Sequence, residues 1–137
     1  HSMFAPSKQL DELLGKVPYN KPPRSIHMLP NSVVHDLELC LPYYSEKILS
    51  RAMLFLLHLQ EQNIALPRVN SVKMVGLTLH WPDEEIRMAF DEDDCSIWTG
   101  KTPAPTFFFN SEKCPLDSTE KMESMANEIV FLLGTKR

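Results

Sequence analysis

The chain has 137 residues, the length of a single domain. Hydrophobic residues make up 43% and charged residues 23%, which are ordinary values for a folded protein and exclude wholesale disorder. The 18 acidic residues outnumber the 14 basic residues, and the resulting net charge of -4 argues against a general affinity for nucleic-acid backbones, which needs a surplus of Lys and Arg.

The first thirty residues are predicted to form a proline-rich N-terminal arm, followed by a single domain over residues 31–137. His1-Ser2 is typical of the remnant of a cleaved expression tag. The spacing of the leucines indicates a short helix that ends at Gly15, and the prolines up to Pro30 exclude regular structure after it. We expect the arm either to lie over the domain or to reach a partner.

Two helices are predicted between residues 31 and 63. Asn31 or Ser32 is positioned to cap the first helix, which Pro42 ends. Ser45 is positioned to cap the second helix, which runs to about Asn63. The apolar residues of this second helix cover more than one stripe, and a helix of that kind is buried on two sides. We therefore place it at the centre of the fold.

After residue 67 the hydrophobic period changes to two, which predicts an antiparallel meander. The loop at residues 82–85 sets a register that places His80 opposite Arg87 and Leu79 opposite Met88. Alternate residues of the strand that follows this loop, beginning with residue 86, are expected to point inward. The predicted strands are Val69–Met74, Leu77–Trp81, Ile86–Phe90 and Cys95–Thr99, and Thr106–Phe109 has the composition of a strand.

The last helix is predicted to begin at an Asp117 cap, with Glu120 in the capping-box position, and to stop at Gly134. Its apolar residues form one face. The predicted fold class is therefore α+β: an antiparallel β-meander of three to five strands packed against a central helix and a C-terminal helix.

Acidic residues gather in two turns of this meander. A calcium loop is not indicated, because the second turn lacks the central glycine and the closing glutamate of such a loop. The turns fall at opposite ends of a hairpin, roughly 15 Å or more apart at ~3.4 Å per residue, so they do not hold one ion together. They are predicted to be either solubilising turns or an acidic surface that docks a basic protein surface. The residues are Asp83, Glu84, Glu85, Asp91, Glu92, Asp93 and Asp94.

Two aromatic residues are candidate anchors for a partner, Trp98 and Phe108. In the run of three phenylalanines, Phe108 points away from its two neighbours, so either another element covers both faces of that strand or one aromatic marks an interface. The acidic surroundings disfavour base stacking, which normally comes with Lys and Arg.

Motifs for catalysis and cofactor binding are weak. Two combinations resemble a general-base pair: His80 with Asp83 or Glu84, and His35 with Asp36. Neither combination has a nucleophile next to it. The four glycines are isolated and form no phosphate-binding loop. The three cysteines are widely spaced, which indicates reduced thiols and a cytoplasmic location. The histidines do not have the spacing of zinc ligands. No cofactor or metal is predicted, and the longest apolar run is too short to span a membrane.

Residues 48–98 contain a predicted helix, Leu66-Pro67, the G-x-x-x-x-W strand Gly76–Trp81, and the alternating strand Ile86–Phe90 that ends in an acidic turn. In this order of features the segment resembles a class of small uncharacterised bacterial α+β domains. Asp93-Asp94 stands where Asp-Gly often occurs in that class. The resemblance implies a helix-plus-meander fold and a bacterial or phage origin, and it implies no activity.

We expect a non-catalytic protein-binding module, such as an inhibitor, an antitoxin-like protein or an accessory subunit. It would present an acidic surface to a protein partner with a basic surface. Direct binding of nucleic acid or of a membrane is not expected. Self-association through the arm or the phenylalanine run is a further option. The alternative is a small metal-dependent hydrolase or nuclease-like enzyme that uses His80 or His35 with carboxylates. The predicted contact residues are the seven acids of the two turns together with Trp98 and Phe108.

Overall fold

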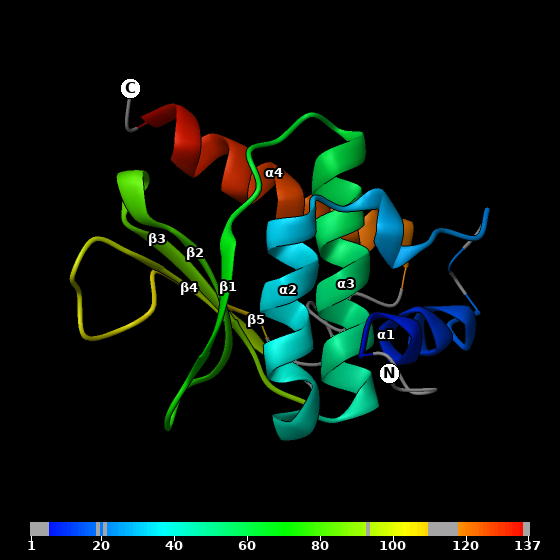
Figure 1. Cartoon of the computed structure of the whole chain (residues 1–137). Coiled ribbons are helices and arrows are strands. Elements are labelled where there is room, and N and C mark those ends of the chain that lie inside the picture. Colours follow the sequence, from blue (N-terminus) through cyan, green and yellow to red (C-terminus); the bar gives the residue numbers. More distant parts are fainter. Residues whose placement is uncertain (1–5, 19, 21, 93, 110–117, 136–137) are drawn as a thin grey trace.

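The fold has two layers, a five-stranded antiparallel sheet and a group of helices that covers one face of it (Figure 1). The computed structural model describes residues 6–18, 20, 22–92, 94–109 and 118–135. The strands lie in the sheet in chain order, β1-β2-β3-β4-β5, as expected for a meander. The predicted α+β class is confirmed.

The sheet has the predicted register. Across the second hairpin, His80 lies opposite Arg87 and Leu79 opposite Met88, as the loop at residues 82–85 predicts. The inward direction of Ile86 is also confirmed, because its side chain is fully buried. The strands are β1 (Arg68–Val72), β2 (Gly76–Trp81), β3 (Ile86–Phe90), β4 (Cys95–Thr99) and β5 (Phe107–Phe109).

Helix α3 (Glu46–Glu61) is the centre of the fold, as predicted. The Ser45 hydroxyl caps it by accepting a hydrogen bond from the Ile48 N–H at 3.2 Å. Every residue from 48 to 59 is buried, because one side of the helix faces the sheet and the others face the remaining helices. The ring of Phe55 meets the ring of Phe90 on β3 edge to face, with centroids 6.3 Å apart.

Helix α2 (Asn31–Cys40) joins the helical layer to the edge of the sheet. Neither Asn31 nor Ser32 caps it; Pro30 is the cap residue, and its carbonyl accepts the N–H groups of residues 33 and 34. The buried Asp36 carboxylate accepts two hydrogen bonds from the Arg68 guanidinium and one from the Val69 N–H, each 3.0 Å long. These bonds attach α2 to β1.

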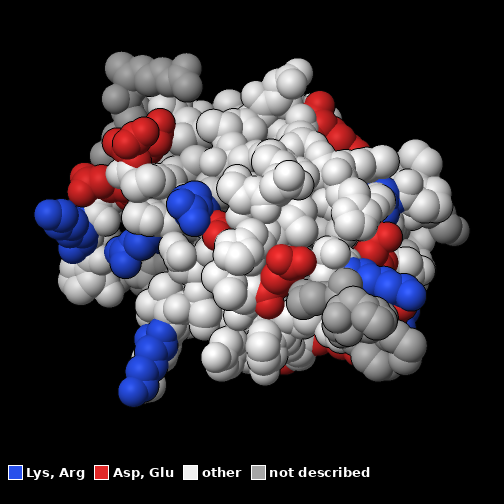
Figure 2. Space-filling view, in the orientation of Figure 1, with Lys and Arg blue, Asp and Glu red and all other residues white. Residues whose placement is uncertain are grey.

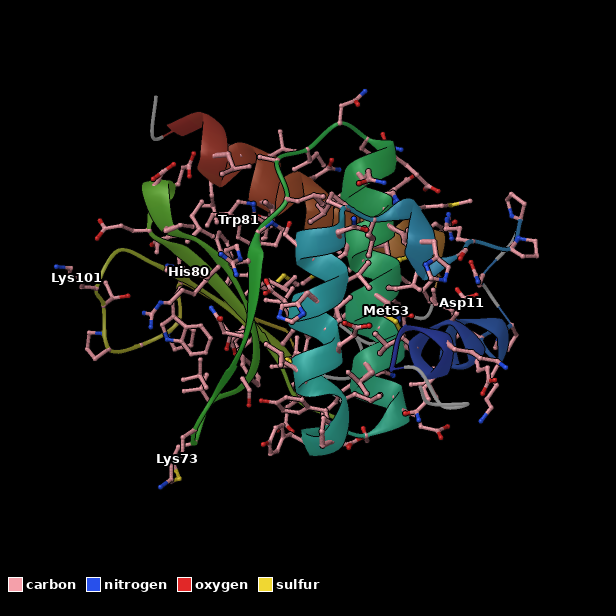
Figure 3. All side chains as sticks on the ribbon, viewed as in Figure 1. Asp11, Met53, Lys73, His80, Trp81 and Lys101 are labelled. Atoms are coloured by element: carbon pink, nitrogen blue, oxygen red, sulfur yellow. The ribbon has the colours of Figure 1, made fainter. Side chains whose placement is uncertain are left out.

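The described part of residues 6–30 lies against the helical layer. Helix α1 (Pro6–Gly15) ends at the predicted glycine and buries Leu10 and Leu14 completely in the common core. The Asp11 carboxylate, labelled in Figure 3, accepts hydrogen bonds from the Ser25 hydroxyl at 3.0 Å and the Ile26 N–H at 2.8 Å. The Arg24 guanidinium pairs with Glu61 at the end of α3, with a shortest N–O distance of 2.7 Å. The described part of residues 6–30 is therefore packed into the same core as the rest of the chain.

The C-terminal end of helix α4 (Thr119–Thr135) differs from the prediction. Gly134 does not stop the helix, which extends one residue further. The Ser118 hydroxyl accepts a hydrogen bond from the Lys121 N–H at 3.2 Å and so caps the first turn. Asp117, the predicted cap, lies outside the described residues.

The cysteines differ in their chemical states. Cys40 is a buried free thiol in α2, and burial raises its pKa to about 11, so it is unreactive at neutral pH. Cys95 on β4 is disulfide-bonded, so the prediction of three reduced thiols is wrong at this position. The third cysteine of the sequence, Cys114, lies outside the described residues. Wide spacing along the sequence does not exclude a disulfide, because a disulfide requires proximity in space and not in sequence.

Candidate functional site

The candidate site is the face of the sheet that points away from the helices, here called the outer face. Because side chains alternate along a strand, the residues between the core positions of β2, β3 and β4 all point to this face. One row runs across four strands in register: Arg68, His80, Arg87 and Trp98. No described helix lies over the outer face (Figure 1).

The two aromatic candidates of the sequence both lie on this face. Trp98 is partly buried, and the Arg87 guanidinium lies over its ring, 5.8 Å from the ring centroid. Phe108 pairs with Ser96 on the neighbouring strand and is 60% exposed. The two rings therefore stand on adjacent strands, diagonally across the ladder, which is within the reach of aromatic side chains.

The turn between β1 and β2 extends beyond the sheet and exposes apolar side chains. Met74 is 96% exposed and has φ of 72°, a left-handed conformation that is uncommon outside glycine. Gly76 follows with φ of 119°, and a Cβ there would lie 3.0 Å from the Phe90 carbonyl oxygen, so this position requires glycine. Val72 and Val75 are the other exposed apolar side chains of this turn.

The first acidic turn closes the hairpin of β2 and β3. Asp83 and Glu84 belong to a 3₁₀ turn (Pro82–Glu84), and Glu85 follows in the left-handed conformation with φ of 53°. The Glu85 carbonyl accepts a hydrogen bond from the Gly100 N–H at 2.8 Å, which ties this turn to the loop at residues 100–106.

The second acidic turn joins β3 to β4 at the opposite end of β3. The Asp91 N–H donates to the Asp94 carbonyl at 2.8 Å, and Arg51 of α3 donates to the Glu92 carbonyl. Asp93 lies outside the described residues. The structure therefore brings the acids together within each turn but not into one patch, and Figure 2 shows acidic and basic side chains interspersed on the visible side of the molecule.

The two predicted general-base pairs, His80 with Asp83 or Glu84 and His35 with Asp36, are not part of a metal site among the described residues. Among the described residues, no group of three or more His, Cys, Asp and Glu side chains is positioned to hold a metal ion. Asp36 is committed to Arg68 and Val69, and His35 instead lies 3.8 Å from Glu38 on the same helix. His80 has no hydrogen bond or ion pair with a carboxylate of the described residues.

A buried histidine that sequence reasoning did not single out, His58 of α3, is expected to make stability depend on pH. Burial lowers its pKa below 6.5 despite the opposing charges of Glu123 and Glu61, and the nearby Arg24 adds to this effect. Because the unfolded chain takes up a proton as the pH falls below 6.5 and the folded protein does not, the free energy of unfolding should decrease towards acidic pH.

The measurement for His58 is urea unfolding of the unmodified protein and His58→Gln between about pH 8 and about pH 5. The variant should lose less stability over this range than the unmodified protein. Equal losses in the two proteins would show that His58 does not carry the dependence.

Sequence reasoning missed several residues of the outer face. Arg87, Lys101 and the exposed valines at the turn between β1 and β2 were not predicted, because the acidic clusters are the more conspicuous feature of the sequence. The alternation of β3 contained a signal, since inward Ile86 and Met88 require an outward Arg87 next to His80. Lys101 had no such signal, because it lies in the irregular loop between β4 and β5.

Comparisons with protein-family models, with curated proteins and with solved structures gave no match. The resemblance to small bacterial α+β domains therefore stays a prediction. Within the described part of the chain, no helix combines the length and the apolar character that crossing a membrane requires.

Proposed function

We propose that this chain is a non-catalytic protein-binding module that contacts its partner through the outer face of the sheet. The observation that supports the proposal is the pair of aromatic side chains on this uncovered face, Trp98 and the 60% exposed Phe108. Aromatic residues supply much of the binding energy at protein interfaces, and exposed apolar surface of this kind is characteristic of such contacts.

The two acidic turns border the same hairpin at its two ends. In this proposal they act as a charged rim that meets basic groups on the partner surface, which raises the association rate and selectivity more than the affinity. An inhibitor, an antitoxin-like protein and an accessory subunit are all compatible with this mode of contact. A cytoplasmic location remains a prediction whose premise, three reduced thiols, does not hold at Cys95.

The test is affinity capture with the immobilised protein, followed by calorimetry of the purified partner. Trp98→Ala and Phe108→Ala should each weaken binding of that partner by about tenfold or more, the usual effect of removing an interface aromatic. The matched control is Phe131→Ala on α4, because Phe131 is 63% exposed and so resembles Phe108 in type and exposure. Unchanged affinity in both sheet variants would contradict the proposal.

The acidic rim needs a separate variant. Charge reversal of Asp91 and Asp94 to lysine should slow association, and the difference from the unmodified protein should shrink as salt is raised. An association rate that does not respond to this reversal at low salt would remove the acidic turns from the contact.

A further inference from the structure

The outer face carries a groove formed by two adjoining hollows of about 290 and 490 Å³. Arg87 and Thr102 line both hollows, so the two halves of the groove adjoin at these residues. It is lined by residues of β2, β3 and β4, by the loop at residues 100–106 and, in the smaller hollow, by Val72 and Val75 at the turn between β1 and β2.

The two halves of the groove differ in chemistry. The smaller half is mainly apolar and is lined by Val72, Val75, Trp98 and Pro103. The larger half is polar and is lined by His80, Lys101 and Glu85 together with the shared residues. Figure 3 shows His80 and Lys101 on the side of the sheet away from α2 and α3.

Within the part of the chain that the structure describes, the cations of the groove have no acidic partners. Among the described residues, neither Arg87 nor Lys101 forms an ion pair, and the contact made by Arg87 is with the ring of Trp98. Arg68, in the same row, differs because Asp36 neutralises it. Glu85 is the acid that lines the polar half, so the groove holds two cations against one carboxylate.

The apolar half and the two cations together determine which kind of segment can bind in the groove. A basic segment would bring like charges against Arg87 and Lys101, which costs binding energy. A nucleic-acid strand would need a longer run of cations along its phosphates than this acidic chain offers. A segment with one apolar side chain and neighbouring carboxylates matches both halves of the groove.

We propose that this groove binds an extended acidic segment of the partner protein, with an apolar side chain against Val72, Val75 and Trp98 and a carboxylate at Arg87 and Lys101. The inference rests on the proposed function and deepens it, because it names the part of the partner that enters the outer face. The acidic turns meet other, basic parts of the partner at the ends of the hairpin.

The experiment is an NMR titration with blocked hexapeptides, observing the two tryptophan indole N–H groups of the chain. The probe is Glu-Asp-Leu-Phe-Glu-Asp, and the comparison peptides are Lys-Arg-Leu-Phe-Lys-Arg, Glu-Asp-Ser-Ser-Glu-Asp and an octathymidylate strand. The Trp98 resonance should shift saturably with the probe and weakly with the others. Trp81 is the internal reference, because it is buried and its indole N–H donates to the Ala65 carbonyl at 2.7 Å.

Variants locate the charge contact. Arg87→Gln and Lys101→Gln should each weaken binding of the probe by about twofold to fivefold, the range for a charge contact at a partly exposed site. Lys73→Gln is the matched control, because Lys73 is an exposed lysine in the turn between β1 and β2 and does not line either half of the groove. An unchanged Trp81 resonance in each variant verifies that the fold is intact.

Three results would overturn the inference: no saturable shift of Trp98 with the probe, tighter binding of the basic peptide, or tighter binding of octathymidylate. The first result, together with loss of partner binding in Trp98→Ala, leaves the protein-binding function in place and rejects only the acidic segment. Probe binding in a protein whose partner affinity is unaffected by both Trp98→Ala and Phe108→Ala rejects the proposed function instead.

Discussion

Replacing Asp36 with alanine is expected to lower the free energy of unfolding by about 2–4 kcal/mol. The carboxylate is only 5% exposed and accepts three hydrogen bonds from Arg68 and Val69 on β1. Alanine leaves the buried Val69 N–H without this acceptor and removes the polar connection between α2 and β1. The Arg68 side chain is 63% exposed, so water replaces its lost partner.

Two further variants separate the parts of this effect, measured by urea unfolding at neutral pH. Asp36→Asn keeps an oxygen that accepts the Val69 N–H and loses the ion pair, so its cost should be smaller than that of alanine. Glu38→Ala changes a carboxylate on the same helix that lies 3.8 Å from the exposed His35, and it should change stability by less than about 0.5 kcal/mol. A loss in Asp36→Ala no larger than that in Glu38→Ala would show that the connection is not important for stability.

The Asp36 carboxylate should also make the free energy of unfolding depend on pH in the acidic range. Burial alone would raise the pKa of Asp36, but the hydrogen bonds from Arg68 and Val69 and the charges of Arg68 and His35 together lower it below 3.8. The stabilisation is therefore present above pH 3.8 and is lost as the pH falls through the lower pKa of the folded state. In Asp36→Asn this acid-dependent loss should be absent.

The strands and their register were predictable because they depend on local patterns. Alternation identified β3, and the loop length fixed the pairing of His80 with Arg87. The bond of Asp36 to β1 was not predictable, since it joins residues that are 32 and 33 positions apart and depends on how α2 lies against the sheet. From sequence, Asp36 suggested only a general-base pair with the adjacent His35.

The candidate site was predictable in part for the same reason. Trp98 and Phe108 were found because they are large and alternate with core residues. The groove was not found, because it forms only where the loop after β4 and the turn after β1 flank the same strands. Charge clustering in the sequence indicated a contact surface at the two ends of β3, whereas the row across the sheet contains Arg87 between His80 and Trp98.

The second large effect is expected in the core beneath the groove. Phe55→Ala should lower the free energy of unfolding by about 3–5 kcal/mol, since it removes a fully buried ring and leaves a cavity next to Phe90. This is a large fraction of the stability of a domain, which is typically about 5–15 kcal/mol. Phe131→Ala removes the same side chain from an exposed position and should cost less than about 0.5 kcal/mol.

A double-mutant cycle tests whether the ring contact itself contributes. Phe55→Ala and Phe90→Ala together should cost less than the sum of the single changes, by about 0.5–1.5 kcal/mol, if the edge-to-face pair is a direct interaction. Strict additivity would show that each ring is stabilised only by its general burial. Because Phe90 and Arg87 lie on the same strand with opposite orientations, a loosened Phe55 contact should also shift the Trp98 indole resonance. The helical layer would then determine the shape of the groove through β3, which lies between the core and the proposed binding surface.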